Sequence, residues 1–419
     1  MLDVMKENLG NPEVLEKMYR DDRKAFRAAF DKLFQDAAGS EALKFWKARL
    51  DYESRPDMLK ALTVTEIAAV IVIGLIVALL IRIPALVSLP YSDDIYFMKN
   101  AAIIVSAGLV LYTFWFNRFT ETRQLLIAGI AYLIPLVYVN LLPSTEAYSS
   151  VNLVFIHLPL LMWFIYGVVF TGFDFTDLGK RISFIRHNGD LAIIFALIAI
   201  AGGMLSAITI GLFDSIGMNI EEFYAENIIV SGAAAAPVVA AFITSKYPSL
   251  LNKTAPLIAG IFSPMVLLTL VIFLVTMTFS GKDPYNDRDF LLIFNVMLLG
   301  VMAIIIFSVS ETSLTRNQKF NAAILFSLSL VAIIIDLIAL SAIFYRLGEY
   351  GLTPNRLAVL VSNVLVLINL VLIMADLFRI NFRKMEFRMV EMTTAKYLPV
   401  YLIWIVIVVF AFPLIFGLK

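Results

Sequence analysis

Eleven runs of roughly twenty mostly apolar residues follow one another along this chain after residue 61. Each run is long enough to cross the ~30 Å hydrocarbon core of a bilayer as an α-helix. We expect these helices at residues 62–83, 101–116, 125–142, 151–172, 191–212, 228–243, 254–279, 290–309, 321–344, 357–377 and 397–416. Hydrophobic residues make up 60% of the sequence, above their usual share in soluble proteins. The sequence therefore predicts an all-α, multi-pass membrane helix bundle.

Lys and Arg are distributed unevenly between the predicted helices. Residues 1–61 hold twelve of them, and most of the others fall in the even-numbered loops. Because basic residues concentrate in cytoplasmic segments, we expect the amino terminus and the even loops to be cytoplasmic. With an odd number of helices, the carboxyl terminus at Lys419 would then be extracytoplasmic.

Residues 1–61 form the only sizeable segment outside the predicted membrane helices. Asn11 and Pro12 have the chemistry of a helix start, and Phe26, Phe30 and Leu33 recur at helical spacing. We expect a small amphipathic helical head on the cytoplasmic side. About fifty residues bury little apolar surface, so we expect its aromatic side chains to pack on cytoplasmic loops or on a partner protein. A helix lying on the membrane surface is the alternative.

Polar landmarks recur in the same order in two distant parts of the chain. Residues 91–96 and 120–124, around the second predicted helix, resemble residues 283–289 and 312–318, around the eighth. This order suggests two parallel five-helix repeats, at 62–212 and 254–419, with an outer loop and linker helix at 213–253. Chance similarity of short polar segments is the alternative.

Small residues and prolines concentrate around the proposed junction of the repeats. Small residues let helices approach closely, and prolines free backbone carbonyls. We expect tight helix packing there, with a broken helix beside a cavity as the alternative. The residues are Gly202, Gly203, Gly211, Gly232 with Ala233 to Ala236, Pro237, Pro256, Gly260 and Pro264.

Asp336 is the most costly residue for a membrane helix in this sequence. It is expected roughly 12 Å from the outer end of its helix, where an Asp costs about 2.5–3.5 kcal/mol on insertion scales. His157, Asn363 and Asn295 are expected at similar depth in three other helices. We hypothesise that these four residues line a ligand pocket open to the extracytoplasmic side, with Asp336 as its charged or proton-carrying group. Hydrogen bonds that merely join helices are the alternative for His157 and the two asparagines.

Four further charged residues, Glu66, Arg82, Glu311 and Asp376, are expected near helix ends. Snorkelling of these side chains toward the interface explains them. The loop 379–396 interleaves five basic residues with Phe382, Phe387 and Met389. That pattern fits binding to anionic lipids at the cytoplasmic face, although the positive-inside rule explains the same charges.

The segment between the ninth and tenth predicted helices carries a short motif. It reads Arg346, Leu347, Gly348, Glu349, Tyr350, Gly351, Leu352, Thr353, Pro354, Asn355, Arg356. This pattern resembles the signature of a broad family of bacterial multi-pass inner-membrane proteins known only as a domain of unknown function. The resemblance implies a bacterial inner membrane but no substrate.

The same motif also has the chemistry of a turn between two helices. Gly348 or Gly351 suits a left-handed helix end, Leu352 can pack back on that helix, and Thr353 with Pro354 suits the next helix start. Arg356 in a first turn opposes the helix dipole. We therefore expect it to pair with Glu349, a lipid phosphate or an anionic ligand.

Motifs of the common enzyme classes are missing from the sequence. There is no P-loop, no Gly-x-Ser-x-Gly and no His-Glu-x-x-His, and only His157 and His187 occur. We therefore assign no catalytic residue, metal ligand or cofactor, and zero net charge does not suggest nucleic acid. A transporter of a small solute or lipid is favoured. A membrane sensor, binding or assembly subunit that acts through its cytoplasmic head is the alternative.

Overall fold

A computed structural model of the chain describes residues 2–36, 41–54, 63–87, 89, 91–143, 148–215, 218–279, 285, 288–312, 318–383 and 385–417. Every regular element in these ranges is a helix, which confirms the predicted all-α class. The chain divides into two compact units, Met1–Val64 and Thr65–Lys419.

The first unit contains four helices, α1 (Leu2–Glu7), α2 (Pro12–Asp21), α3 (Arg23–Asp36) and α4 (Glu41–Ser54). Helix α2 starts as expected, because the Asn11 side chain accepts a hydrogen bond from the Val14 amide at 3.4 Å. The prediction that the aromatic residues pack on loops or a partner is wrong for the buried rings. Tyr19, Phe26 and Trp46 pack on one another, with ring centroids 4.8–5.5 Å apart. They belong to a small core that α1–α4 form among themselves.

Eleven helical spans in the described part of the second unit are long and apolar enough to cross a membrane, as predicted. The first span is followed by the short helix α6 (Ile83–Leu86), and two spans contain a π-helical turn. The spans are α5 (Val64–Ile81), α7 (Asp93–Asn117), α8 (Thr122–Leu141), α9 (Ser149–Phe170), α10 (Leu178–Ser215), α11–η2–α12 (Glu221–Tyr224, Ala225–Ile229, Val230–Lys246), α13 (Pro248–Phe279), α14 (Arg288–Thr312), α15 (Gln318–Tyr350), α16 (Pro354–Arg383) and α17–η3–α18 (Arg388–Val406, Ile407–Ala411, Phe412–Ile415).

Most of these helices extend beyond the predicted apolar run. Helix α10 begins at Leu178, well before the predicted 191, and α7 begins at Asp93, before 101. Hydropathy marks only the part of a helix that lies in hydrocarbon, whereas the backbone continues as helix through polar turns. The acidic residues Asp93 and Asp94 suit the first turn of α7 because they complement its dipole.

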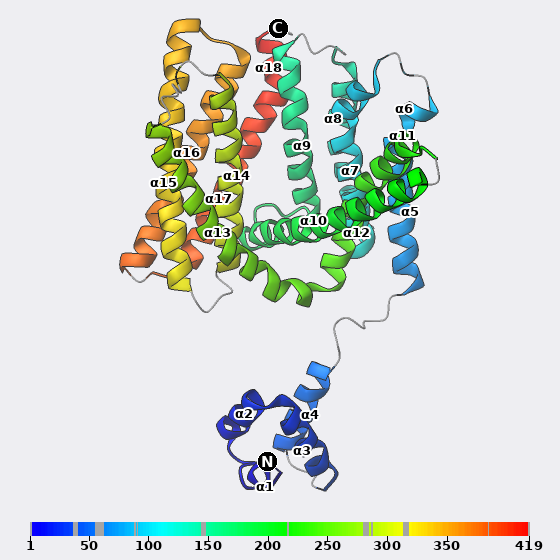
Figure 1. Ribbon diagram of the computed structural model, residues 1–419, viewed down its shortest axis with the longest axis vertical. Coiled ribbons are helices and arrows are strands. Elements are labelled where there is room, and N and C mark those ends of the chain that lie inside the picture. Colours follow the sequence, from blue (N-terminus) through cyan, green and yellow to red (C-terminus); the bar gives the residue numbers. More distant parts are fainter. Residues whose placement is uncertain are drawn as a thin grey trace. The chain divides into compact units, whose positions relative to one another are not determined.

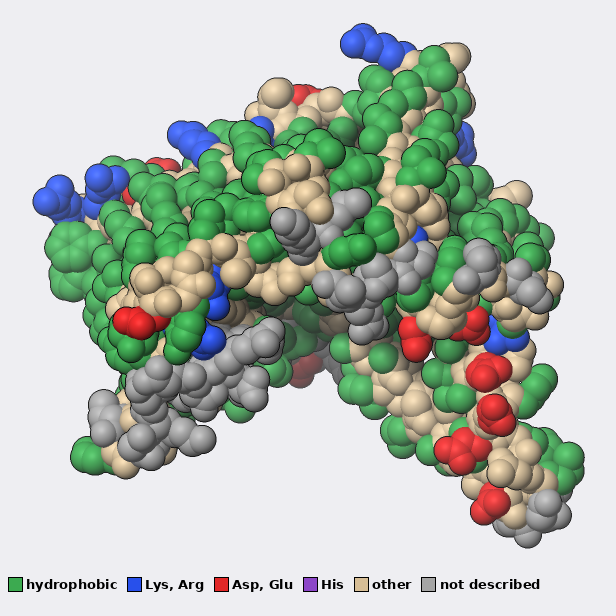
Figure 2. All heavy atoms as spheres, turned by 90° about the horizontal axis from the view of Figure 1, so that it is seen from above, with side chains coloured by type: hydrophobic (Ala, Val, Ile, Leu, Met, Phe, Trp, Pro, Cys, Tyr) green, Lys and Arg blue, Asp and Glu red, His purple; other side chains and the backbone are tan. Residues whose placement is uncertain are grey.

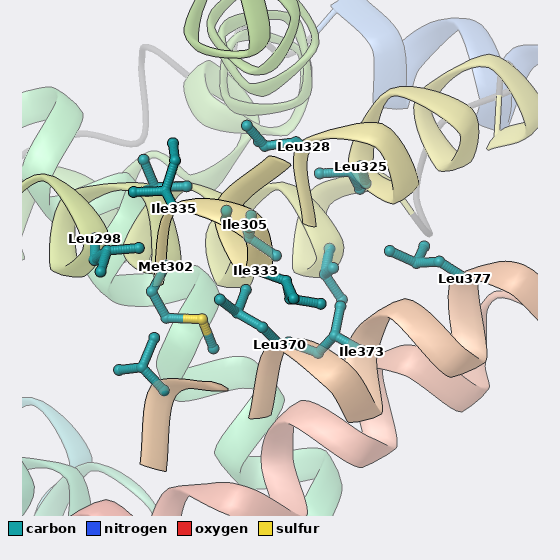
Figure 3. Close-up of a cluster of buried hydrophobic side chains, with 14 of the residues drawn as sticks. Leu298, Met302, Ile305, Leu325, Leu328, Ile333, Ile335, Leu370, Ile373 and Leu377 are labelled. Atoms are coloured by element: carbon teal, nitrogen blue, oxygen red, sulfur yellow. The ribbon is translucent and has the colours of Figure 1, made fainter. Parts of the chain in front are cut away.

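Helices α9, α14 and α15 run along the long axis of the view in Figure 1, whereas α10 and α13 cross it obliquely. The largest apolar cluster lies between α13, α14, α15 and α16. Figure 3 shows how Met302, Ile305, Ile333 and Leu370 converge there from three helices. Separate clusters join α5, α7 and α12, and α7, α8, α9 and α17. Many large apolar side chains are exposed on the described helices, which suits contact with lipid. Figure 2, seen from above the view of Figure 1, shows hydrophobic side chains over much of the molecule with charged ones among them.

The glycines of the predicted junction do not pack tightly inside the described chain. A Cβ atom added at Gly202, Gly203, Gly211, Gly232 or Gly260 would meet no atom within 4 Å. The prediction is therefore wrong for these glycines, whereas Ala234 and Ala236 of the same junction are buried. Close helix contacts at glycine occur elsewhere. An added Cβ would lie 2.6 Å from the Val77 side chain at Gly108 of α7, and closer still to the Phe307 side chain at Gly189 of α10. The proposed repeat itself stays a prediction, because residues 283, 287 and 315–317 lie outside the described ranges.

Candidate functional site

Asp336 lies in the middle of α15 and is completely buried, with an exposed fraction of 0%. Neither carboxylate oxygen has a hydrogen-bond partner among the described residues. Ala332 and Ala339, one turn away on either side, are buried too, and α15 packs extensively along α16. Asp336 therefore faces protein and not lipid, as the sequence predicted. In this conformation it is closed off from the surface, so no open pocket reaches it.

Other polar atoms near this level of the bundle are also incompletely paired. The Asn369 amide of α16 donates to the Tyr401 hydroxyl of α17 at 3.0 Å, but its own oxygen accepts no hydrogen bond from the described residues. Tyr401 lies within electrostatic range of Asp336. The Ser329 hydroxyl, on the Asp336 face of α15, is buried and has no partner among the described residues. We call Asp336, Ser329, Asn369 and Tyr401 the Asp336 site.

The structure brings together two of the other three residues predicted for the pocket. The Asn363 amide of α16 donates to the Asn295 side chain of α14 at 2.8 Å. The His157 Nδ1 atom instead lies 2.8 Å from the Leu153 carbonyl of its own helix. No described hydrogen bond joins either group to Asp336. Their convergence on one pocket stays a prediction.

The turn between α15 and α16 follows most of the expected chemistry. Gly351 has a left-handed φ of 72°, Pro354 begins α16, and the Arg356 amide donates to the Thr353 hydroxyl oxygen at 3.3 Å. Leu352 does not pack back on α15, because it is 60% exposed.

Arg356 bonds to backbone carbonyls and not to Glu349 among the described residues, whereas its pairing with a lipid phosphate or an anionic ligand stays a prediction. Its guanidinium donates to the Tyr350 and Gly351 carbonyls at 2.7 Å and lies over the Tyr350 ring. It satisfies carbonyls at the end of α15 and makes no described ion pair with Glu349. The Arg346 Nη1 atom, one turn before Tyr350, is buried without a described partner.

Sequence reasoning missed a partly buried charged cluster at the opposite end of the bundle from that turn. Arg186 of α10 donates to the Glu391 carboxylate of α17 at 2.6 Å and to the Ser310 carbonyl of α14 at 2.9 Å. Glu311 is buried and interacts electrostatically with Arg186, Glu391 and Asp190. We call Arg186, Asp190, Glu311 and Glu391 the Arg186 cluster.

The snorkelling interpretation is therefore wrong for Glu311, and it is wrong for Asp376 and Glu66 as well. Asp376 is buried and accepts hydrogen bonds from Arg379 at 3.0 Å and Thr393 at 2.5 Å. Glu66 pairs with Lys246 of α12 at 2.5 Å. The signal available in the sequence was the number of acidic residues near helix ends. Hydropathy alone cannot show which basic residue of another helix meets them.

The described residues contain no group of three or more His, Asp or Glu side chains that could hold a metal ion. The chemistry offered by the Asp336 site is therefore that of a carboxyl group with nearby amide and hydroxyl groups, which suits a proton or a polar solute. Comparisons of the chain with protein families, curated proteins and solved structures find no match. The eleven long, apolar helices of the described chain identify the protein as an integral membrane protein.

Proposed function

We propose that this protein is a membrane transporter in which Asp336 carries a proton, and that the present conformation holds the Asp336 site occluded. The observation that carries this proposal is the lack of any described partner for both Asp336 oxygens at 0% exposure. A polar residue that only joins helices would be hydrogen-bonded across them, as Asn363 is to Asn295. An ionisable residue inside a membrane bundle is a mark of an ion, proton or substrate pathway.

The proposed mechanism needs a second conformation that admits water to the site. A charged carboxylate with no partner in an apolar core is unfavourable, so Asp336 carries its proton while occluded. When the bundle opens, water stabilises the charged form and the proton leaves. Asn369 and Tyr401 then offer an amide oxygen and a hydroxyl to the polar part of a solute. The predicted orientation places the Asp336 site in the outer half of the membrane. We therefore expect the opening that admits water to face the extracytoplasmic side.

Thiol labelling tests this proposal without background, because the chain has no cysteine. The variant Ser329→Cys, at a buried residue of the Asp336 site, is made in the full chain, and membrane vesicles are treated with a charged methanethiosulfonate reagent. We expect slow labelling that a pH gradient accelerates, and loss of that acceleration in Ser329→Cys/Asp336→Asn, which lacks the proton-carrying carboxyl group. Leu337→Cys, 51% exposed on the outer surface of the same helix, is the matched control that stays unlabelled in lipid. Tyr350→Cys at the exposed end of α15 is the positive control. Labelling of Ser329→Cys no faster than that of Leu337→Cys under every condition, or the same pH dependence with and without Asp336→Asn, would overturn the proposal.

The separate head supports one alternative, a sensor or assembly subunit. Residues of the first unit form their own core, and Phe45 exposes most of its ring beside buried Trp46. Deleting residues 1–60 distinguishes the two functions. A transporter keeps the pH-dependent labelling of Ser329→Cys, whereas a subunit that acts through the head loses or changes it.

A further inference from the structure

An open groove lies between α15 and α16, away from the Asp336 site and independent of the function proposed above. Its volume is about 410 Å³, within the range of ~300–1,000 Å³ typical of ligand pockets. Its lining comes from the first half of α15 and the last third of α16. The residues are Phe326, Leu330, Met374, Ala375, Phe378, Arg379 and Arg383.

Aromatic and aliphatic side chains form most of the groove. The rings of Phe326 and Phe378 lie 6.3 Å apart, and Phe382 lies 4.7 Å from Phe378 and 6.2 Å from Phe326. These rings have no covering element within the described chain, since Phe382 is 65% exposed and Phe378 43% exposed. Phe387, which the sequence placed on the same lipid surface, is instead buried in the bundle. The groove thus presents an apolar surface toward the lipid.

Two arginines mark the end of the groove where α16 ends. Arg379 and Arg383 are one helical turn apart and so lie on the same side of the helix. The Arg379 guanidinium is oriented by Asp376, at 3.0 Å. Arg383 has no ion pair or hydrogen bond to the part of the chain that the structure describes. A guanidinium with free donors at the membrane boundary suits a phosphate group.

We propose that this groove is a binding site for one anionic phospholipid. An acyl chain lies along Phe326, Leu330 and Met374, and the phosphate lies between Arg379 and Arg383. Along the groove the apolar side chains come first and the two arginines lie at the end of α16. A phospholipid has the same arrangement, from its acyl chains to its charged headgroup. Basic pockets between membrane helices bind anionic headgroups in this way. A soluble anion would use the arginines but not the aromatic wall.

Native mass spectrometry of the full-length protein tests the site. The protein is titrated with phosphatidylglycerol and, separately, with phosphatidylcholine, which carries no net charge. We expect the protein to retain phosphatidylglycerol and to bind it with an affinity on the order of 10-fold higher than its affinity for phosphatidylcholine. The variant Arg379→Gln/Arg383→Gln should lose that preference. The matched control is Arg118→Gln/Arg123→Gln, which removes two exposed arginines of another loop and should keep the preference.

Two further variants test whether the lipid binds in the groove itself. Arg383→Gln alone removes a groove-lining side chain with no described hydrogen bond or ion pair, so a reduced preference there does not come from a lost internal polar contact. Ala375→Trp fills the groove and should weaken the binding of both lipids. Equal binding of the two lipids, an unchanged preference in Arg379→Gln/Arg383→Gln, or equal competition by inorganic phosphate would overturn the proposal.

Discussion

The Arg186 cluster and the Asp336 site both bury carboxyl groups in the membrane unit, but only the first contains a cation. In the Arg186 cluster one guanidinium reaches a carboxylate of α17 and a carbonyl of α14. In the Asp336 site the carboxyl group of α15 has no described partner. The comparison separates two uses of buried charge. A cluster whose cation pairs with a carboxylate holds helices together, whereas a buried carboxyl group without a partner lowers stability and persists where function requires it.

Removal of Arg186 should have the largest effect of the changes that test this comparison. Arg186→Met leaves buried Glu391 and Glu311, and half-buried Asp190, without their cation. We expect the free energy of unfolding to fall by about 3–5 kcal/mol, because a buried charge that loses its partner is strongly destabilising. Thermal unfolding in detergent measures it. The double variant Arg186→Met/Glu391→Gln should recover part of the loss. A change below about 1 kcal/mol in Arg186→Met would show that the cluster does not hold α10, α14 and α17 together.

Substitution of Asp336 should have the opposite sign. Asp336→Leu replaces an unpartnered polar group by an apolar one of similar size. We expect the free energy of unfolding to rise by about 1–3 kcal/mol, the cost of burying a polar group without hydrogen bonds. The same unfolding measurement applies. Asp336→Asn keeps a polar group at this position, so its free energy of unfolding should rise less than that of Asp336→Leu. A fall in stability in Asp336→Leu would mean that the carboxyl group has a partner, and the contrast with Arg186 would disappear.

Glu16 of the head extends the comparison to a half-buried carboxylate outside the membrane unit and should give the smallest effect. The hydrogen bond from Arg20 and the charge of Arg49 hold its pKa below the ordinary value of 4.5, against the opposing effect of desolvation. The stabilisation is therefore complete above pH 4.5 and is lost as the pH falls through the lowered pKa.

Glu16→Gln should accordingly lower the free energy of unfolding of the head by about 0.2–1 kcal/mol at pH 7. Once the wild-type carboxylate is protonated, the substitution should leave that free energy unchanged. Hydrogen exchange of the α2 and α4 amides in the full chain measures this difference. Glu13→Gln, a carboxylate of the same helix without a described ion pair, is the control. An effect that grows on acidification would contradict the assignment.

The number and order of the membrane helices followed from the sequence, and so did the turn at Gly351. Both depend on local physics. An apolar run in hydrocarbon must satisfy its backbone as a helix, and a left-handed residue at a helix end favours glycine. The burial of Asp336 against protein was predictable in the same way, because small residues share its helical face and an Asp is costly in lipid.

Long-range partners could not be predicted in the same way. Arg186 and Glu391 are 205 residues apart, and Asn295 and Asn363 are 68 apart. The sequence of one membrane helix does not determine how the helix is rotated or which helices it contacts, because lipid tails are as apolar as the side chains they touch. For the same reason Gly202, Gly203 and Gly211 of α10 looked like a packing seam, although the described chain places no atom against them.

By itself the sequence determined that this is an eleven-helix membrane protein with one costly carboxyl group, because hydropathy and helix geometry act residue by residue. Only the tertiary structure decided which charges are paired, that Asp336 is sealed, and that α15 and α16 enclose a groove ending in two arginines. These outcomes depend on how helices far apart in the chain rotate and dock, and the packing of the whole bundle sets that.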